Sequence, residues 1–155
     1  MKLEEWLDAA AVSAREIAGG PLGASQLDWA GASSAALPGD LWGVYIPLLT
    51  EGFALQLGVL GTRDVCAGLA RALLGDLDGD SVSSDEDVFD AVGEITNLIA
   101  GNVKVLLADR ANIRVGVPLA MRGRVLPLGG SRSIHGSLAV DQKDVWLVMT
   151  GTATR

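Results

Sequence analysis

The sequence predicts an α+β domain in which an antiparallel sheet is covered on one face by two long helices. Segments with apolar residues at helical spacing are separated along the chain by runs of extended character, and hairpin-length connections join most of these runs. The regular strand–helix–strand alternation of a parallel sheet is missing. With 155 residues, 49% of them hydrophobic, the chain is expected to form one domain, residues 1–155, with a substantial core.

The first 40 residues are predicted to form a helix and a loop. Apolar side chains from Leu3 to Ile17 keep helical spacing up to the stop signal Gly19-Gly20-Pro21. The segment 21–40 is rich in Gly, Ala, Ser and Pro and has few apolar anchors. It is therefore interpreted as a loop, with a short edge strand around residues 26–30.

The remaining elements are predicted from the spacing of apolar residues and from the glycines that mark turns and helix ends. Two extended runs, 42–49 and 53–60, form a predicted hairpin around a turn that contains Gly52. Helical spacing over 63–74 ends at Gly75, a residue suited to a helix C-terminus. Further strands are predicted in the last third of the chain, the final two joined by a turn at 141–144: residues 112–121, 135–140 and 145–152.

The segment 83–107 is predicted to be the longest helix. Two overlapping capping boxes, Ser83 with Glu86 and Ser84 with Asp87, mark its start, and its first acidic residues suit the positive end of the helix dipole. At about 100° per residue, one narrow stripe is apolar and predicts the core-facing side. This stripe comprises Val88, Val92, Ile95, Ile99, Val103 and Leu106, bordered by Phe89, Thr96 and Leu107.

The opposite side of this helix carries a polar row, which should point away from the sheet. Steps of three and four residues align Asp90, Glu94, Asn97, Gly101 and Lys104 on neighbouring turns. A glycine inside a helix costs roughly 1 kcal/mol relative to alanine, and a second glycine at position 93 borders the row. The two glycines suggest a surface that another backbone approaches closely; the alternative is an ordinary solvated face.

The motif Asp90-x3-Glu94-x2-Asn97, followed by Leu-Ile-Ala-Gly-Asn and by Pro118 in a predicted strand, resembles the CheX/CheC/FliY family of chemotaxis phosphatases. In that family an acid-x3-Glu-x2-Asn helix is followed by a proline twenty-odd residues later, and here 20 residues separate Asn97 from Pro118. The resemblance covers about residues 41–152, while the first 40 residues match poorly. Because Glu-x2-Asn occurs once, the CheX-like branch is favoured.

The resemblance implies a phosphatase that hydrolyses the aspartyl phosphate of a CheY-like response regulator. It assigns catalysis to Asn97, which would orient the attacking water, and to Glu94, which would pair with a lysine of the regulator. Supporting or partner-facing roles would fall to Asp90, Gly101, Lys104 and Pro118. The protein would need no cofactor of its own, with Mg²⁺ held by the regulator. A non-catalytic scaffold or regulator-binding module of the same fold is the alternative.

Assembly and location follow from the same resemblance and from composition. CheX-like proteins are similar to one another in forming homodimers, and long hydrophobic strands in so short a chain would leave sheet edges that need a partner. The sequence contains no apolar run of 18 residues and no apolar signal segment, so we expect a cytoplasmic protein without a membrane span.

Charge and residue counts exclude other classes of protein. Residues 1–103 carry net charge −12 and residues 104–155 carry +5, so nucleic acid is not expected to be the partner. A single cysteine, Cys66, and a single histidine, His135, cannot assemble a Cys/His zinc site.

A calcium-responsive domain is a less favoured alternative. Four acids in the loop before the long helix, Asp76, Asp78, Asp80 and Asp87, match EF-hand positions 1, 3, 5 and 12. The match fails at position 6, where Ser81 replaces the glycine of the turn, and at position 12, where aspartate replaces the bidentate glutamate. No metal site is therefore predicted.

Overall fold

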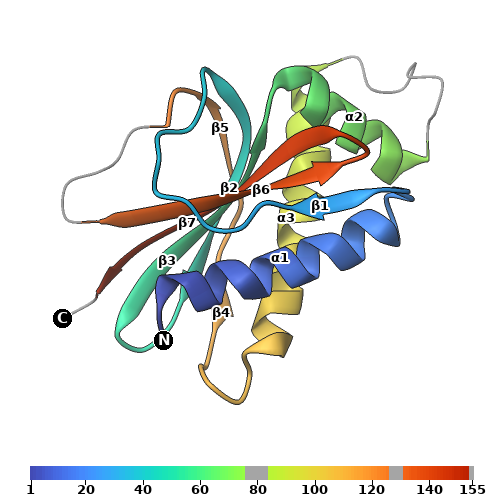
Figure 1. Cartoon of the computed structure of the whole chain (residues 1–155). Coiled ribbons are helices and arrows are strands. Elements are labelled where there is room, and N and C mark those ends of the chain that lie inside the picture. Colours follow the sequence, from blue (N-terminus) through green and yellow to red (C-terminus); the bar gives the residue numbers. More distant parts are fainter. Residues whose placement is uncertain (76–83, 126–130, 154–155) are drawn as a thin grey trace.

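The computed structural model describes residues 1–75, 84–125 and 131–153 (Figure 1). Every strand pair in it is antiparallel, in the order β1–β6–β7–β3–β2–β4 with β5 also paired to β2, which confirms the predicted α+β class. The helices are α1 (Leu3–Gly19), α2 (Arg63–Leu74) and α3 (Asp85–Leu106). The strands are β1 (Leu27–Trp29), β2 (Leu41–Leu49), β3 (Phe53–Gly61), β4 (Arg114–Val115), β5 (Leu119–Gly123), β6 (Arg132–Val140) and β7 (Lys143–Ala153).

All three helices pack on one face of the sheet, and α1 crosses α3 (Figure 1). At the crossing, the buried Ser13 hydroxyl donates to the Ile99 carbonyl at 3.2 Å. Alternate residues of the central strands point to the helices, as the two-residue period of a strand requires. These core residues are Val44, Ile46, Leu48, Leu55, Leu57, Val59, Ile134, Leu138, Val145, Leu147 and Met149.

Helix α3 begins and packs largely as its sequence predicts. Ser84 is the N-cap, and its hydroxyl accepts a hydrogen bond from the Asp87 amide at 3.1 Å, whereas the Ser83 box lies outside the described residues. The apolar stripe is buried as far as Val103. The expectation for Leu106 was wrong: its side chain is 45% exposed, because the helix ends there and Leu107, the C-cap, enters the core instead.

The predicted strand 112–121 was also wrong, because the chain forms two short strands, β4 and β5, with a break between them. Both pair with β2, with Leu48 opposite Val115 and Tyr45 opposite Leu119. An advance of three residues along β2 therefore faces an advance of four residues along the segment from β4 to β5. The extra residue makes a β-bulge. Prolines on both sides of the gap, Pro47 and Pro118, lack the amide hydrogens that a continuous ladder needs.

The other turns and ends agree with the predicted boundaries within a few residues. Gly75 ends α2 in the left-handed conformation, with φ 69°. Asp141 and Gln142, at φ 48° and 69°, form the tight turn between β6 and β7. The Asp141 carboxylate accepts hydrogen bonds from the Ser25 and Gln26 amides at 2.9 and 2.8 Å, which fixes the entry to the predicted edge strand β1. None of the described helices is both long and apolar enough to cross a membrane.

Candidate functional site

A groove of about 370 Å³ lies between α3 and the chain segment that leads into β5. We call it the signature groove, because it brings together Asp90, Glu94, Asn97 and Pro118. Its lining is completed by Val44, Phe89, Gly93 and Ala120. Pro118, which follows Asn97 by 21 positions in the sequence, therefore lies across the groove from the helix.

The polar groups of the groove are available to an incoming molecule. Asp90, Glu94 and Asn97 are exposed, and no side-chain hydrogen bond or ion pair joins them to another described residue. Their spacing of four and three residues places them on successive turns of one helix face. The face thus presents two carboxylates and one amide, which acts both as donor and as acceptor.

The buried side of α3 holds this face in place. Ile95 and Ile99 are 3% and 2% exposed and anchor the turns that carry Glu94 and Asn97. The buried Thr96 hydroxyl donates to the Val92 carbonyl one turn earlier at 2.7 Å, so its polar group is satisfied inside the helix. Packing on one side therefore fixes the direction of the polar side chains on the other.

The opposite wall of the groove is built by the bulge between β4 and β5. The Gly116 amide donates to the Pro47 carbonyl at 2.8 Å, and a Cβ atom at position 116 would lie only 3.0 Å from the Pro47 ring. This close approach turns the chain so that Pro118 faces the helix. A Cβ atom built at Gly93 would lie 4.0 Å from Pro118 and from Val44. Both neighbours are side-chain atoms at ordinary contact distance, so the described chain shows no close backbone approach at Gly93 of the kind that the sequence suggested.

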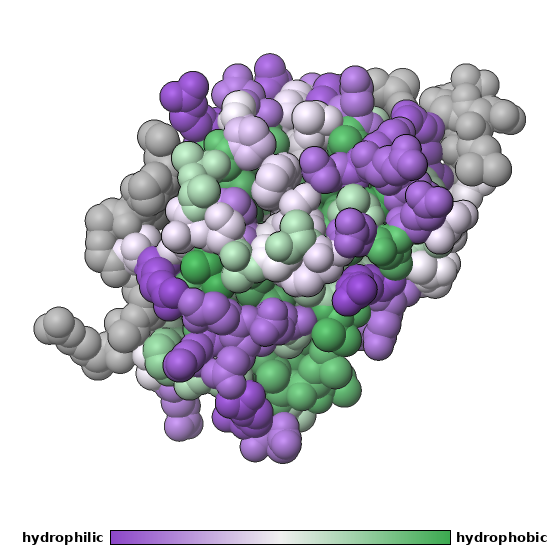
Figure 2. Space-filling view, in the orientation of Figure 1, coloured by the Kyte–Doolittle hydropathy of each residue, from purple (hydrophilic) through white to green (hydrophobic). Residues whose placement is uncertain are grey.

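The rest of the polar row lies outside the groove. Gly101 and Lys104 are exposed, and a Cβ atom at position 101 would meet nothing within 4 Å. The row thus points away from the sheet at these residues, while nearer the helix start it borders the sheet edge. Hydrophobic surface lies over the end of α3 (Figure 2), where Val105 is 75% exposed.

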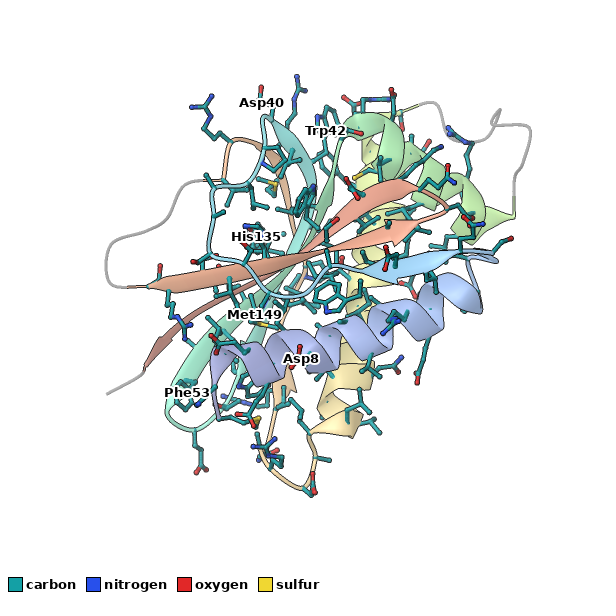
Figure 3. The ribbon with its side chains drawn as sticks, in the orientation of Figure 1. Asp8, Asp40, Trp42, Phe53, His135 and Met149 are labelled. Atoms are coloured by element: carbon teal, nitrogen blue, oxygen red, sulfur yellow. The ribbon has the colours of Figure 1, made fainter. Side chains whose placement is uncertain are left out.

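Sequence reasoning missed a cluster at one end of the groove. Trp42, at the start of β2 beside α2 (Figure 3), stacks on Phe89 with ring centroids 5.2 Å apart. The guanidinium groups of Arg122 and Arg63 lie 4.7 and 5.6 Å from the centre of the Trp42 ring. Phe89 was expected at the edge of the core stripe, but no sequence signal paired it with a tryptophan 47 positions earlier.

The described residues offer no cluster of three or more His, Cys, Asp or Glu side chains for a metal ion. Three acids of the calcium alternative, Asp76, Asp78 and Asp80, lie outside the described residues, and Asp87 lies in the first turn of α3. Cys66 is buried, and its thiol donates to the Trp42 carbonyl at 3.3 Å.

A larger hollow, of about 880 Å³, lies on the sheet face opposite the helices. Its floor includes Tyr45, Gln56 and Thr150, and the loop residue Leu37 forms part of its rim. It contains none of the signature-groove residues. Its size alone does not make it the reactive site, because its lining is mainly apolar and lacks the motif's converging polar groups.

More than half of the chain matches one known protein family. The family model described as "Chemotaxis phosphatase CheX" matches residues 49–135, more than half of the sequence. The chain belongs to the CheX family. The family expected from the motif is thus confirmed, and the match includes the whole of α3 and every groove-lining residue except Val44. A search of curated proteins gives no match.

Solved structures share the CheX fold across nearly the whole chain. A CheC-like protein from Shewanella sp. PV-4 has a TM-score of 0.80 at 16% identity, covering 99% of this chain and 100% of its own. CheX from Vibrio vulnificus has a TM-score of 0.77 at 16% identity, with 95% and 99% covered. CheX from Borrelia burgdorferi, solved as a CheX–CheY–BeF3–Mg²⁺ complex, has a TM-score of 0.69 at 18% identity, with 94% and 93% covered. The fold thus includes residues 1–40, which the sequence resemblance matched poorly.

Proposed function

We propose that this CheX-family protein hydrolyses the aspartyl phosphate of a CheY-like response regulator, with Asn97 positioning the attacking water and Glu94 binding a lysine of the regulator. The observation that carries the proposal is the convergence of Asp90, Glu94, Asn97 and Pro118 on one groove, with the polar groups unpaired among the described residues. The Borrelia burgdorferi relative, solved with CheY, BeF3 and Mg²⁺, supports this class of partner.

The chemistry demands little of the phosphatase. Water attacks phosphorus, the bond between phosphorus and the aspartyl oxygen breaks, and the products are a free carboxylate and inorganic phosphate, which takes up the proton of the water. Because such a transfer depends on in-line placement and charge neutralisation, a helper accelerates it by fixing one water molecule. The Asn97 amide suits this task, since its oxygen accepts from the water and its nitrogen donates.

The regulator supplies the remaining parts in this proposal. Its own acidic pocket would hold Mg²⁺ against the phosphoryl oxygens, as the family resemblance implies. Glu94, one turn before Asn97, would form a charge-assisted contact with a lysine beside the phosphoaspartate. Asp90 would support this contact, and Gly101 would leave room for the regulator on the next turn. We place the reaction in the cytoplasm, where such regulators work.

The test is single-turnover dephosphorylation of the CheY-like regulators of the same genome, charged with acetyl phosphate in the presence of Mg²⁺. The protein should accelerate phosphate release from one of them. Asn97→Ala at saturating concentration should slow the chemical step by about 10²- to 10³-fold, the usual loss when one positioned hydrogen-bonding group is removed. Asn102→Ala is the matched control, since it removes an amide from the same helix but outside the groove.

A parallel binding titration distinguishes a phosphatase from a non-catalytic regulator-binding module. If Asn97→Ala retains its affinity for the phosphorylated regulator and loses turnover, the phosphatase proposal stands. If the wild type binds a regulator and never accelerates phosphate release, the protein is a regulator-binding module. Unchanged rate and affinity in Asn97→Ala would remove the proposed chemistry from this groove.

A further inference from the structure

Arg122 provides a cation at the end of the signature groove that no described carboxylate neutralises. The described ion pairs join Arg63 to Asp85, Arg110 to Glu5 and Arg132 to Glu4. Arg122 is exposed, and its guanidinium carbon lies 4.7 Å from the centre of the Trp42 ring. Arg63 approaches the same ring, but Asp85 already pairs with it at 3.0 Å.

The contact with Trp42 fixes the position of Arg122 and leaves it able to bind an anion. A guanidinium group over an aromatic face is held by cation–π attraction, while its N–H groups, which lie in its own plane, stay free to donate. Phe89 stacks on Trp42 with an interplanar angle of 12° and also lines the groove. The cluster of Phe89, Trp42 and Arg122 therefore extends continuously from the groove lining to an exposed cation.

The charges around the groove are divided between its two walls. Asp90 and Glu94 on α3 form an acidic wall, whereas β5 contributes Arg122 two positions after the lining residue Ala120, on the same strand face. Neither acid lies within ion-pair distance of Arg122. A partner that fits both walls carries a basic group for α3 and an acidic group for β5.

The cluster that holds Arg122 meets α3 at Phe89, about two turns before Asn97. Phe89, next to Trp42, precedes Asn97 by eight residues, or about 12 Å along the helix axis. A phosphoryl group beside Asn97 is too small to span that length. A phosphoryl-binding role for Arg122 does not fit this geometry, and a second contact with the regulator's surface does.

We propose that Arg122, held on Trp42, is a docking residue that binds a carboxylate side chain on the surface of the phosphorylated response regulator. The inference rests on the proposed function and adds the chemistry of the partner surface. It predicts an effect on complex formation and none on the chemical step, which separates Arg122 from Asn97.

The experiment compares Arg122→Glu with Arg124→Glu, which makes the same charge change at an exposed arginine that lines the hollow on the other sheet face. The probe is the CheY-like regulator activated with beryllofluoride and Mg²⁺, a stable mimic of its phosphorylated form. Arg122→Glu should raise Kd by 10-fold or more relative to Arg124→Glu, and Arg122→Ala should weaken the salt dependence of Kd. The turnover number at saturation should equal that of the wild type.

The outcomes distinguish this inference from the proposed function. If the wild type neither binds nor dephosphorylates any regulator of its genome, both fail. If the wild type is active and the two arginine variants lose the same affinity, only net charge matters and the docking role is wrong. A lower turnover number in Arg122→Ala with normal Kd would place Arg122 in the chemistry instead. Melting temperatures of all variants exclude loss of folding as the cause. Arg122→Lys keeps the charge without the planar guanidinium group, so a smaller rise in Kd than in Arg122→Glu is expected for it.

Discussion

Gly93 of α3 faces Pro118 across the signature groove, so that a methyl group at position 93 would lie 4.0 Å from the proline Cβ atom. This relationship links the helix that carries the motif to the bulge between β4 and β5. Pro118 lines the groove opposite α3, so the proline forms part of the wall that makes a groove out of a helix face. The size of the side chain at position 93 therefore sets the width of the site.

Substitutions at Gly93 should separate stability from activity. Alanine fits at an ordinary contact distance and favours the helix by about 1 kcal/mol, so Gly93→Ala should raise the melting temperature and keep activity. Gly93→Leu should push Pro118 aside and reduce phosphate release. The matched controls are Gly68→Ala and Gly68→Leu in α2, where helix propensity changes away from the groove. Full activity in Gly93→Leu would contradict the assignment of Pro118 as a wall.

Glu94 should contribute to binding more than to turnover. Removing its charge in Glu94→Ala should raise Kd for the beryllofluoride-activated regulator, and Glu94→Lys should raise it further through repulsion of a partner lysine. Glu86→Lys is the control, since it makes the same charge change on an exposed residue in the first turn of α3, outside the groove lining. A normal Kd with a slow chemical step in Glu94→Ala would reverse the roles assigned to Glu94 and Asn97.

Gly101 should matter for partner access and little for folding. A Cβ atom there meets nothing within 4 Å, and leucine is the better helix former, so Gly101→Leu should leave the melting temperature equal or higher. One turn from Asn97, its added bulk should weaken binding of the regulator. Thermal unfolding and the same titration measure both effects. Unchanged binding would mean that the regulator does not approach this turn.

Local signals predicted the helix of the site well and its second wall poorly. The period of apolar residues and the Ser84 cap lie within α3, so its start and its buried face needed no tertiary information. The break at 116–118 depends on the register of two segments against β2, which a single segment does not contain. The same holds for Trp42, whose contacts with Phe89 and Arg122 join three elements far apart in the chain.

Homodimer formation stays a prediction, and the structure changes its basis. The long strands β3 and β7 each pair along their length with two neighbours, while shorter strands form the edges: β1, with three residues, on one side, and β4 and β5, with two and five residues, on the other. Long unpaired edges therefore do not require a partner, and the expectation rests on the family resemblance. Light scattering across a dilution series should give twice the 16.0 kDa chain mass. A concentration-independent monomer would contradict it.

Cys66 should be inert in the folded protein and should make stability depend on alkaline pH. It is 1% exposed, and burial raises the pKa of its thiol from 9.0 to about 11. Because the thiolate is the reactive form, iodoacetamide at pH 8 should label the protein in urea and spare the native state. Rapid labelling of the native protein would contradict the burial of this side chain.

The sign of the pH effect follows from proton binding. Between pH 9 and 11 the native thiol keeps its proton while the unfolded one loses it, so the free energy of unfolding falls as pH rises through this window. Burial also raises the pKa of Tyr45, to about 12, so the tyrosine adds a fall of the same sign at higher pH. Denaturant titrations from pH 8 to 11 should therefore show a shallower decline in Cys66→Ala than in the wild type. If the wild type and Cys66→Ala lost stability equally with pH, the thiol would ionise alike in the native and unfolded states. Cys66 would then be packed more loosely than its hydrogen bond to the Trp42 carbonyl implies.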